Sequence, residues 1–224
     1  MELKIKDIAE LLEVPEKTVL QWIQERGLPA YQINHEYLFN MAEIKEWVLK
    51  NNLNVSHKIL EMSLTRQPVS LSGLLKRGGI FYGIEGNGVN EIIKNAVNIM
   101  PIPQETTREA LAYSLLEREE MMPTAIGKGI AIPHPRNPIL ADIEHESITV
   151  CFLKNPIDYG AIDNKPVRTL FIVLSANPKR HLEILSKISF LCQQEYYTGL
   201  LNEQKDKDSI IRYIEMKEQE WLKK

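Results

Sequence analysis

Cysteine is scarce in this sequence, with only Cys151 and Cys192 among 224 residues. The two are far apart and form no Cys-x-x-Cys pair, so neither a disulfide framework nor a zinc ribbon is indicated. No apolar run reaches the roughly 18 residues that a membrane-spanning helix needs, and the first residues lack the apolar core of an export signal. We therefore expect a cytoplasmic protein without membrane insertion.

An excess of positive charge is also absent. The chain has 27 Lys+Arg against 30 Asp+Glu and a net charge of −3. This balance excludes a protein that holds nucleic acid by bulk positive charge alone. Aromatic residues are few, at 7%, but 44% hydrophobic residues is ordinary for a globular protein and excludes collagen-like and disordered chains. The length fits one large domain or two modest ones.

The first fifty residues predict a compact helical unit. Apolar residues recur at helical spacing over 5–12 and again over 19–23. Pro15 marks the start of the second helix, because proline is tolerated in a first turn and disrupts later ones. Residues 30–39 alternate in part and predict a short hairpin, and residues 41–50 predict a third helix.

This order of elements resembles the winged helix-turn-helix of the excisionase and MerR-like DNA-binding group. The resemblance is carried by Lys6–Ile23, Arg26–Pro29, Tyr37–Phe39 and the residues from Met41 onward. It implies that the second helix enters the major groove of DNA. The side chains expected to contact bases or phosphates include Glu16 and Gln24, and foremost Lys17, Thr18, Gln21 and Arg26.

We expect this domain to cover residues 1–52 and to bind DNA, with a homodimer as the form that reads an operator. Its first fifty residues carry six cationic and nine anionic side chains. DNA-binding domains are usually basic. A second interpretation, in which the helix-turn-helix serves as a protein-interaction module, therefore stays open.

The remainder of the chain predicts a helical linker over 53–68 and an α/β domain over 69–224. The apolar runs 148–153 and 169–174 are too continuous for half-exposed strands and too short for helices, so they predict central strands covered on both faces. Further strands and helices alternate around them, which predicts a mixed β-sheet flanked by helices. The strands are expected near 79–84, 124–127 and 130–133, and the helices near 88–98, 106–119, 178–192 and 207–222.

The segment 119–136 is the most informative part of the sequence. Gly127 and Gly129 let two strands approach closely, and Pro133 stiffens the chain immediately before His134. A lone histidine is more often structural than catalytic, so these local features alone leave the role of His134 open.

The whole segment closely resembles the signature of the IIA components of the bacterial phosphoenolpyruvate-dependent phosphotransferase system, of the fructose, mannitol and nitrogen-regulatory class. The resemblance extends over residues 69–224. It implies that His134 takes a phosphoryl group from the phosphohistidine of an HPr-like carrier protein and passes it on, as a carrier and not as a multiple-turnover enzyme. The signature positions are filled by Glu119, Ile126, Gly127, Ile130, Ala131, Ile132, Pro133 and His134.

Two further residues match the site of this family. The resemblance implies that Arg118 faces His134 and that His181 stands at the start of a helix, so that both hold phosphoryl oxygens. Arg136 is a further candidate for binding the phosphate. Pro135 departs from the family, which usually has glycine or another small residue at this position. Unlike those residues, proline offers no N–H to a phosphate. No metal or cofactor is expected, since transfer between two histidines depends mainly on positioning.

Together the two resemblances imply a phosphorylation-responsive, DNA-binding regulator, with a regulatory protein target as a further partner. Two alternatives stay open. In one, the chain is a sugar-transport IIA carrier that passes its phosphate to a IIB domain. In the other, it keeps the IIA fold as a scaffold that no longer transfers phosphate.

Overall fold

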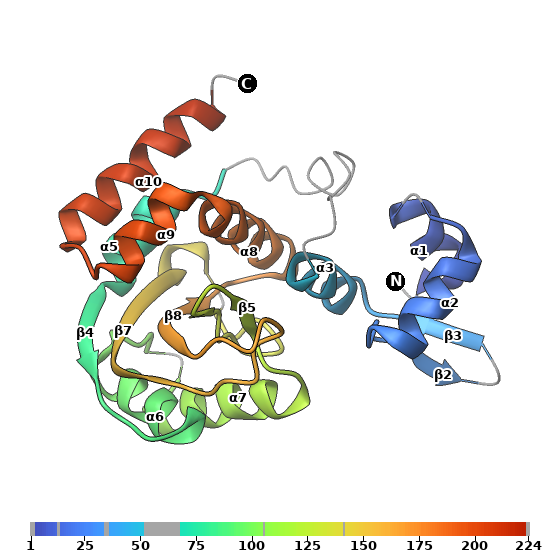
Figure 1. The fold of residues 1–224 in the computed structure, drawn as a ribbon, viewed down its shortest axis with the longest axis horizontal. Coiled ribbons are helices and arrows are strands. Elements are labelled where there is room, and N and C mark those ends of the chain that lie inside the picture. The colour runs from blue at the N-terminus through green and yellow to red at the C-terminus, as the bar shows by residue number, and fades with distance from the viewer. Residues whose placement is uncertain are drawn as a thin grey trace. The chain divides into compact units, whose positions relative to one another are not determined.

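The computed structural model describes residues 3–12, 14–33, 36–51, 68–104, 106–140 and 142–222. The chain divides into two compact units, Met1–Pro68 and Val69–Lys224, which Figure 1 shows in colours running from blue to red along the chain. The helical linker expected over 53–68 lies outside the described residues, apart from Pro68. Among the described helices, none has the length and apolar character to span a bilayer.

The N-terminal unit contains three helices and a small antiparallel sheet with strand order β1-β3-β2. The two-residue strand β1 was not predicted, because two residues show no periodicity. The other elements follow the predicted order of helix, helix, hairpin and helix. The elements are β1 (Leu3–Lys4), α1 (Ile5–Leu12), α2 (Glu16–Glu25), β2 (Tyr31–Ile33), β3 (Glu36–Phe39) and α3 (Met41–Lys50).

The end of α2 is tied to α3. Gly27 adopts a φ of 63°, which a side chain would disfavour, and this reversal lets the Leu28 N–H donate to the Trp22 carbonyl at 3.0 Å. The Trp47 indole donates to the Arg26 carbonyl at 2.8 Å. These contacts close a core formed by Ile8, Ala9, Val19, Leu28, Phe39, Ile44, Trp47 and Val48.

The second unit is an α/β domain with a five-stranded mixed sheet in the order β4-β7-β8-β6-β5. This confirms the predicted fold class, with the two apolar runs in β7 and β8. The elements are α5 (Leu71–Gly78), β4 (Ile80–Ile84), α6 (Val89–Ile99), α7 (Arg108–Met121), β5 (Ala125–Gly127), β6 (Ile130–Ala131), a 3-10 turn (Ile143–His145), β7 (Ser147–Ile157), β8 (Val167–Leu174), α8 (Pro178–Gln193), α9 (Glu195–Asn202) and α10 (Lys207–Trp221).

Helices cover both faces of this sheet (Figure 1). Cys151 and Leu170 belong to the core cluster that includes residues of α6 and α7. Ile148 and Phe171 instead line the layer under α5, α8, α9 and α10. Alternate residues of β7 and β8 therefore serve opposite cores, which explains why both strands are apolar throughout.

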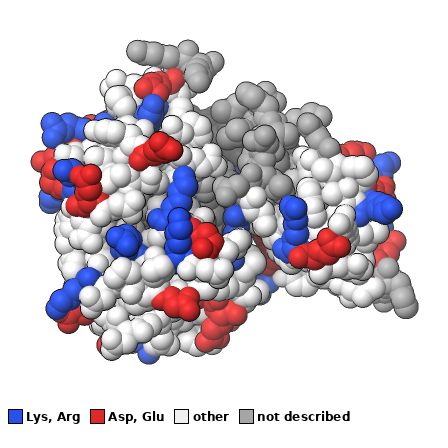
Figure 2. Space-filling view, in the orientation of Figure 1, with Lys and Arg blue, Asp and Glu red and all other residues white. Residues whose placement is uncertain are grey.

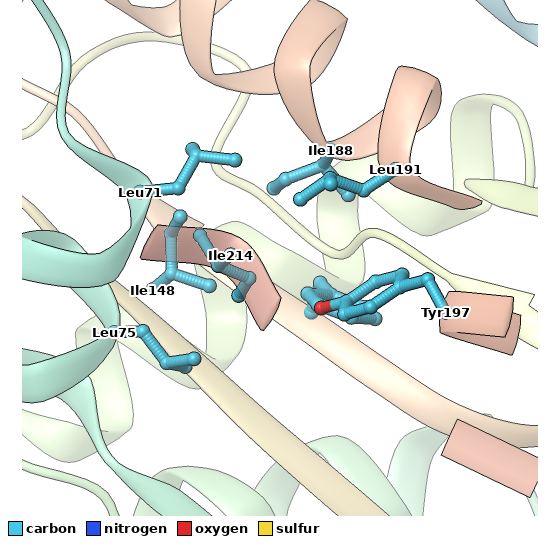
Figure 3. Close-up of a pocket in the computed structure, with 8 residues that line it drawn as sticks. Leu71, Leu75, Ile148, Ile188, Leu191, Tyr197 and Ile214 are labelled. Carbon is cyan, nitrogen blue, oxygen red and sulfur yellow. The ribbon is translucent and has the colours of Figure 1, made fainter. Parts of the chain in front are cut away.

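The layer under α5 and α8 is tightly packed (Figure 3). Leu71 and Leu75 lie there with Ile188, Tyr197 and Ile214, around a cavity of only about 10 Å³. That volume is about one water molecule, so this region is part of the core and not a ligand site.

Candidate functional site

A tight turn between β5 and β6 begins the segment that carries His134. Gly127 and Gly129 have φ angles of 87° and 77°, which only glycine adopts without strain. Between them, the Lys128 N–H donates to the Asp163 carboxylate at 2.8 Å. This contact anchors the turn against the loop before β8, so the start of β6 has a fixed position.

His134 lies where two parallel strands end at the same edge of the sheet. β6 pairs in parallel with β8, and the Val173 N–H extends this pairing by donating to the Pro133 carbonyl at 2.9 Å. The segment that follows β8 leads directly to His181 in α8. The carboxyl ends of the two strands therefore bring these histidines together, with ring centroids 4.8 Å apart.

The hydrogen bond from Nδ1 of His134 determines which ring nitrogen carries the proton and which carries the lone pair. Nδ1 lies 2.7 Å from the Ile132 carbonyl oxygen. A carbonyl can only accept, so Nδ1 carries the proton and Nε2 of the neutral ring carries the lone pair. Burial, followed by the charge of Arg118, lowers the pKa of His134 from 6.5 to about 4. At neutral pH the imidazole is therefore uncharged, and the residue is only 3% exposed.

His181 lies in the first turn of α8 and is half-buried. Its Nδ1 lies 3.1 Å from the Ser175 hydroxyl. Burial is the main reason why the pKa of His181 lies well below its usual value, and electrostatic interactions with His134 and with the Arg118 charge lower it further. The ring is neutral at physiological pH and can donate one N–H.

Arg118 lies in the last turn of α7 and is 5% exposed. Its Nη1 donates to the Met122 carbonyl at 2.7 Å, which holds the side chain along the end of the helix. The guanidinium lowers the pKa of both His134 and His181, so its charge acts on both rings. The structure thus brings the three predicted residues together.

Glu119, the acidic residue of the predicted signature, is also buried near the histidines. Its carboxylate accepts the Thr124 N–H at 2.8 Å and the Thr124 hydroxyl. Burial raises its pKa, and the hydrogen bonds with Thr124 act in the opposite direction. These bonds fix the turn between α7 and β5. They therefore also fix the position of Arg118 relative to β6.

Arg136 and Pro135 follow His134 directly. Pro135 is buried and Arg136 is exposed. The proposed contact of Arg136 with phosphate stays a prediction.

The sequence analysis did not identify Ser175 as a site residue. It stands directly after the apolar run 169–174, at the end of β8, and contacts the ring of His181. A polar residue at the end of a central strand is the one signal that could have marked it.

The residues predicted to contact DNA lie on and just after α2. Lys17, Gln21 and Arg26 are exposed, and Thr18 is half-buried. Gln21 donates to Glu25 at 2.8 Å, and the Arg26 guanidinium lies 5.9 Å from the centre of the Trp22 ring. On the face drawn in Figure 2, basic and acidic side chains of the described residues are interspersed.

A surface hollow lies elsewhere on the second unit. It has a volume of about 520 Å³ and runs between α6 and α7, lined by residues that include Lys94, Arg108 and Tyr113. None of the three site residues lines it, so the hollow is separate from the chemistry of His134. Within the described parts of the chain, no group of three or more His, Cys, Asp or Glu side chains could hold a metal ion.

Comparison with known proteins gives two family matches. Residues 73–217 match the family described as phosphoenolpyruvate-dependent sugar phosphotransferase system, EIIA 2, and residues 2–52 match a helix-turn-helix domain. The chain is 30% identical over 125 residues to the nitrogen regulatory protein of Pseudomonas aeruginosa, an alignment that covers 54% of this chain and 79% of that protein.

A second relative is the fructose-specific EIIABC component of Bacillus subtilis, at 29% identity over 149 residues. The match covers 65% of this chain but only 23% of that protein, so the chain spans about a quarter of its length. Among solved structures, a PTS IIA domain from Streptococcus pyogenes has a TM-score of 0.53 at 18% identity, covering 66% of this chain and 96% of that one. This structural likeness concerns the fold.

Proposed function

Because the chain belongs to the EIIA type 2 family of the phosphoenolpyruvate-dependent sugar phosphotransferase system, we propose that its second unit is a phosphohistidine carrier. In this proposal His134 accepts a phosphoryl group from the phosphohistidine of an HPr-like carrier protein and passes it on. The observation that carries the proposal is the neutral His134 imidazole, whose proton is held on Nδ1 by the Ile132 carbonyl.

The transfer step needs no added proton. The lone pair on Nε2 of His134 attacks the phosphorus, a new N–P bond forms, and the N–P bond to the donor histidine breaks. The donor ring carries a proton on its other nitrogen, so it leaves with the electron pair of that bond as a neutral imidazole, and the ring of phosphorylated His134 takes over its positive charge. The proton of His134 stays on Nδ1 throughout and remains hydrogen-bonded to the Ile132 carbonyl. Positioning of the two rings is the main catalytic requirement, because similar bonds are formed and broken.

Arg118 and His181 hold the phosphoryl oxygens in this step. The fixed charge of Arg118 balances the charge spread over those oxygens, and an N–H of His181 donates to one of them. Pro135 contributes no N–H, so the oxygens depend on these side chains.

The experiment for this step measures phosphate incorporation from a phosphorylated HPr-like carrier. The wild-type chain becomes labelled and His134→Ala does not. His145→Ala is the matched control, because His145 is an exposed histidine of the same unit, and it is labelled like the wild type. Labelling of His134→Ala at the wild-type level would contradict the proposal.

For the whole chain we propose a regulator whose DNA binding responds to phosphorylation of His134. Two observations support this: a helix-turn-helix match over residues 2–52 in the same chain as the IIA domain, and a nitrogen regulatory protein among the relatives. Phosphorylation adds about two negative charges, enough to dock or release a neighbouring surface. A regulatory protein target and a homodimer are the further partners of this proposal.

DNA binding is tested by selection from random duplexes, followed by titration of the selected duplex with each form of the protein. Lys17→Ala is expected to weaken binding. It should also reduce the slope of the logarithm of the binding constant against the logarithm of the salt concentration by about one, as for the loss of one phosphate contact. Gln21→Ala is expected to relax base preference. Lys207→Ala, an exposed lysine of the second unit, is the control. Equal binding by phosphorylated and unphosphorylated protein would contradict the regulatory part.

A second function is favoured by the similarity to the fructose-specific EIIABC component. In this alternative the chain supplies phosphate to a IIB domain for sugar transport. Incubation of the phosphorylated chain with a purified IIB domain distinguishes the two functions. Rapid and complete transfer to IIB supports transport, and retention of the phosphate supports regulation.

A further inference from the structure

One buried carboxylate lies beneath the loop that leads to His181. Glu146 is completely buried just before β7. Its Oε1 accepts the Ala176 N–H at 3.0 Å, and its Oε2 accepts Nε–H of Arg180 at 2.7 Å. Its main-chain carbonyl accepts from Arg77 of α5 at 2.7 Å. Both carboxylate oxygens are therefore engaged, and the residue is held from three directions.

The two partners of this carboxylate adjoin the contact between Ser175 and His181. Ala176 directly follows Ser175, and Arg180 directly precedes His181. The loop between them is closed by a helix cap, since the Arg180 N–H donates to the Asn177 side chain at 3.0 Å. Glu146 thus joins the two ends of the loop whose closure places the Ser175 hydroxyl 3.1 Å from Nδ1 of His181.

We propose that Glu146 is a positioning residue for phosphoryl transfer, acting through Ser175 and His181. By holding Ala176 and Arg180, Glu146 keeps Ser175 in place. The Ser175 hydroxyl then donates a hydrogen bond to Nδ1 of His181. The imidazole proton then resides on Nε2, which donates to a phosphoryl oxygen on His134. This inference rests on the proposed carrier function and adds to it the residues that set the tautomer of His181.

The energetics of buried ion pairs agree with a positioning role. The side chains of Glu146 and Arg180 are 0% and 8% exposed. Desolvation of two buried charges offsets much of their attraction, so such a pair adds little net stability compared with apolar residues of similar size. Glu146 instead fixes the geometry of the loop, because its hydrogen bonds with Ala176 and Arg180 each hold one end of the loop.

The first test compares Glu146→Gln with wild type in single-turnover transfer from a phosphorylated carrier protein. Gln keeps the size of the side chain, but its N–H₂ group then faces a hydrogen-bond donor, either the Ala176 N–H or the Arg180 side chain. One of the two hydrogen bonds that hold the loop is therefore lost. The saturating rate is expected to fall about 10- to 100-fold, since small displacements of a reacting group have costs of this size. The carrier concentration at half-saturation is expected to stay unchanged, because Glu146 is completely buried and offers no surface to the carrier.

Glu183→Gln is the matched control. Glu183 is also a largely buried carboxylate that accepts a main-chain N–H, from Val69 at 2.9 Å, and pairs with Lys187 on the same helix, α8. Among the described residues, its hydrogen-bond and ion-pair partners are Val69 and Lys187, and neither belongs to the loop between β8 and α8. This variant is expected to transfer phosphate at the wild-type rate. An equal loss of rate in Glu183→Gln and Glu146→Gln would reduce Glu146 to a general structural role and overturn the proposal.

A second readout follows the ring nitrogens of His181 by nitrogen NMR without any phosphate. The wild type is expected to hold the proton on Nε2, and both Glu146→Gln and Ser175→Ala are expected to give a mixture of tautomers. Ser175→Ala keeps the buried ion pair, so it tests the idea even if Glu146→Gln fails to fold. Unchanged His181 tautomers in Ser175→Ala would overturn the proposal. Failure of the wild type to take up phosphate would contradict the carrier function alone.

Discussion

The imidazole rings of His134 and His181 lie with their centroids 4.8 Å apart and their planes inclined by 55°. They come from different strand ends, one following β6 and the other following β8 by way of α8. Both rings are neutral at physiological pH, because burial lowers the pKa of each. One ring can therefore act as a nucleophile while the other donates a hydrogen bond to the group it attacks.

The lowered pKa of His134 predicts a loss of stability in acid. The pKa is about 4 in the folded chain, against 6.5 for an ordinary histidine. Between these values the unfolded chain binds more protons, so the free energy of unfolding falls as the pH is lowered from 6.5 to 4. The contribution of His134 to this fall is about 3 kcal/mol. His134→Gln should lose that much less stability over this range.

Urea unfolding at a series of pH values measures this effect. An identical dependence in wild type and His134→Gln would show that His134 is not held neutral by its surroundings.

Arg118 is predicted to act on both the pKa of His134 and the transfer rate. In Arg118→Met the pKa of His134 should rise, because the neighbouring positive charge is lost, but stay below 6.5, because burial is the larger cause. The transfer rate should fall about 100-fold, as when one donor to a developing anion is removed. Arg118→Lys should keep the lowered pKa but lose rate, since lysine lacks the forked donor geometry.

An NMR titration of His134 and single-turnover transfer measure these two quantities. Arg212→Met, which removes an exposed arginine of α10, serves as the control and should leave both unchanged. A His134 pKa that does not move in Arg118→Met would contradict the proximity of the charge and the ring.

Gly78 is predicted to be essential for packing of α5 on the sheet. A Cβ atom at this position would lie 2.1 Å from the Ile148 carbonyl oxygen of β7. Because main-chain atoms cannot give way cheaply, Gly78→Ala should lower the free energy of unfolding by about 3 kcal/mol. Gly199→Ala in α9 meets open space and should be stabilising by about 0.5–1 kcal/mol. Chemical denaturation of both variants tests this difference.

The sequence was sufficient to predict the main strands but not every helix. The runs 148–153 and 169–174 were recognisable because strands covered on both faces are apolar throughout. Helix α5 was missed because Gly73 and Gly78 weaken its helical signal, and α9 because Tyr196, Tyr197 and Gly199 are poor helix formers. Both are stabilised by packing, α5 mainly on β7 and α9 on α8 and α10.

The candidate site also contains some residues that could be predicted from the sequence and others that could not. His134, Arg118 and His181 could be named because a family signature places them. Glu146 and Ser175 could not, because their contacts depend on chain segments that are distant from His134 in sequence. The link from Glu146 to Arg180 spans 34 positions, and only the folded sheet brings these residues together.

The most direct test of the carrier proposal identifies the phosphorylated atom. The chain is labelled from a phosphorylated HPr-like carrier, and nitrogen and phosphorus NMR then determine which histidine and which ring nitrogen bears the phosphate. The Ile132 carbonyl holds the proton on Nδ1 of His134, so phosphate on Nε2 of His134 is the predicted result. Phosphate on Nδ1 of His134, on another histidine or on no residue would contradict the account.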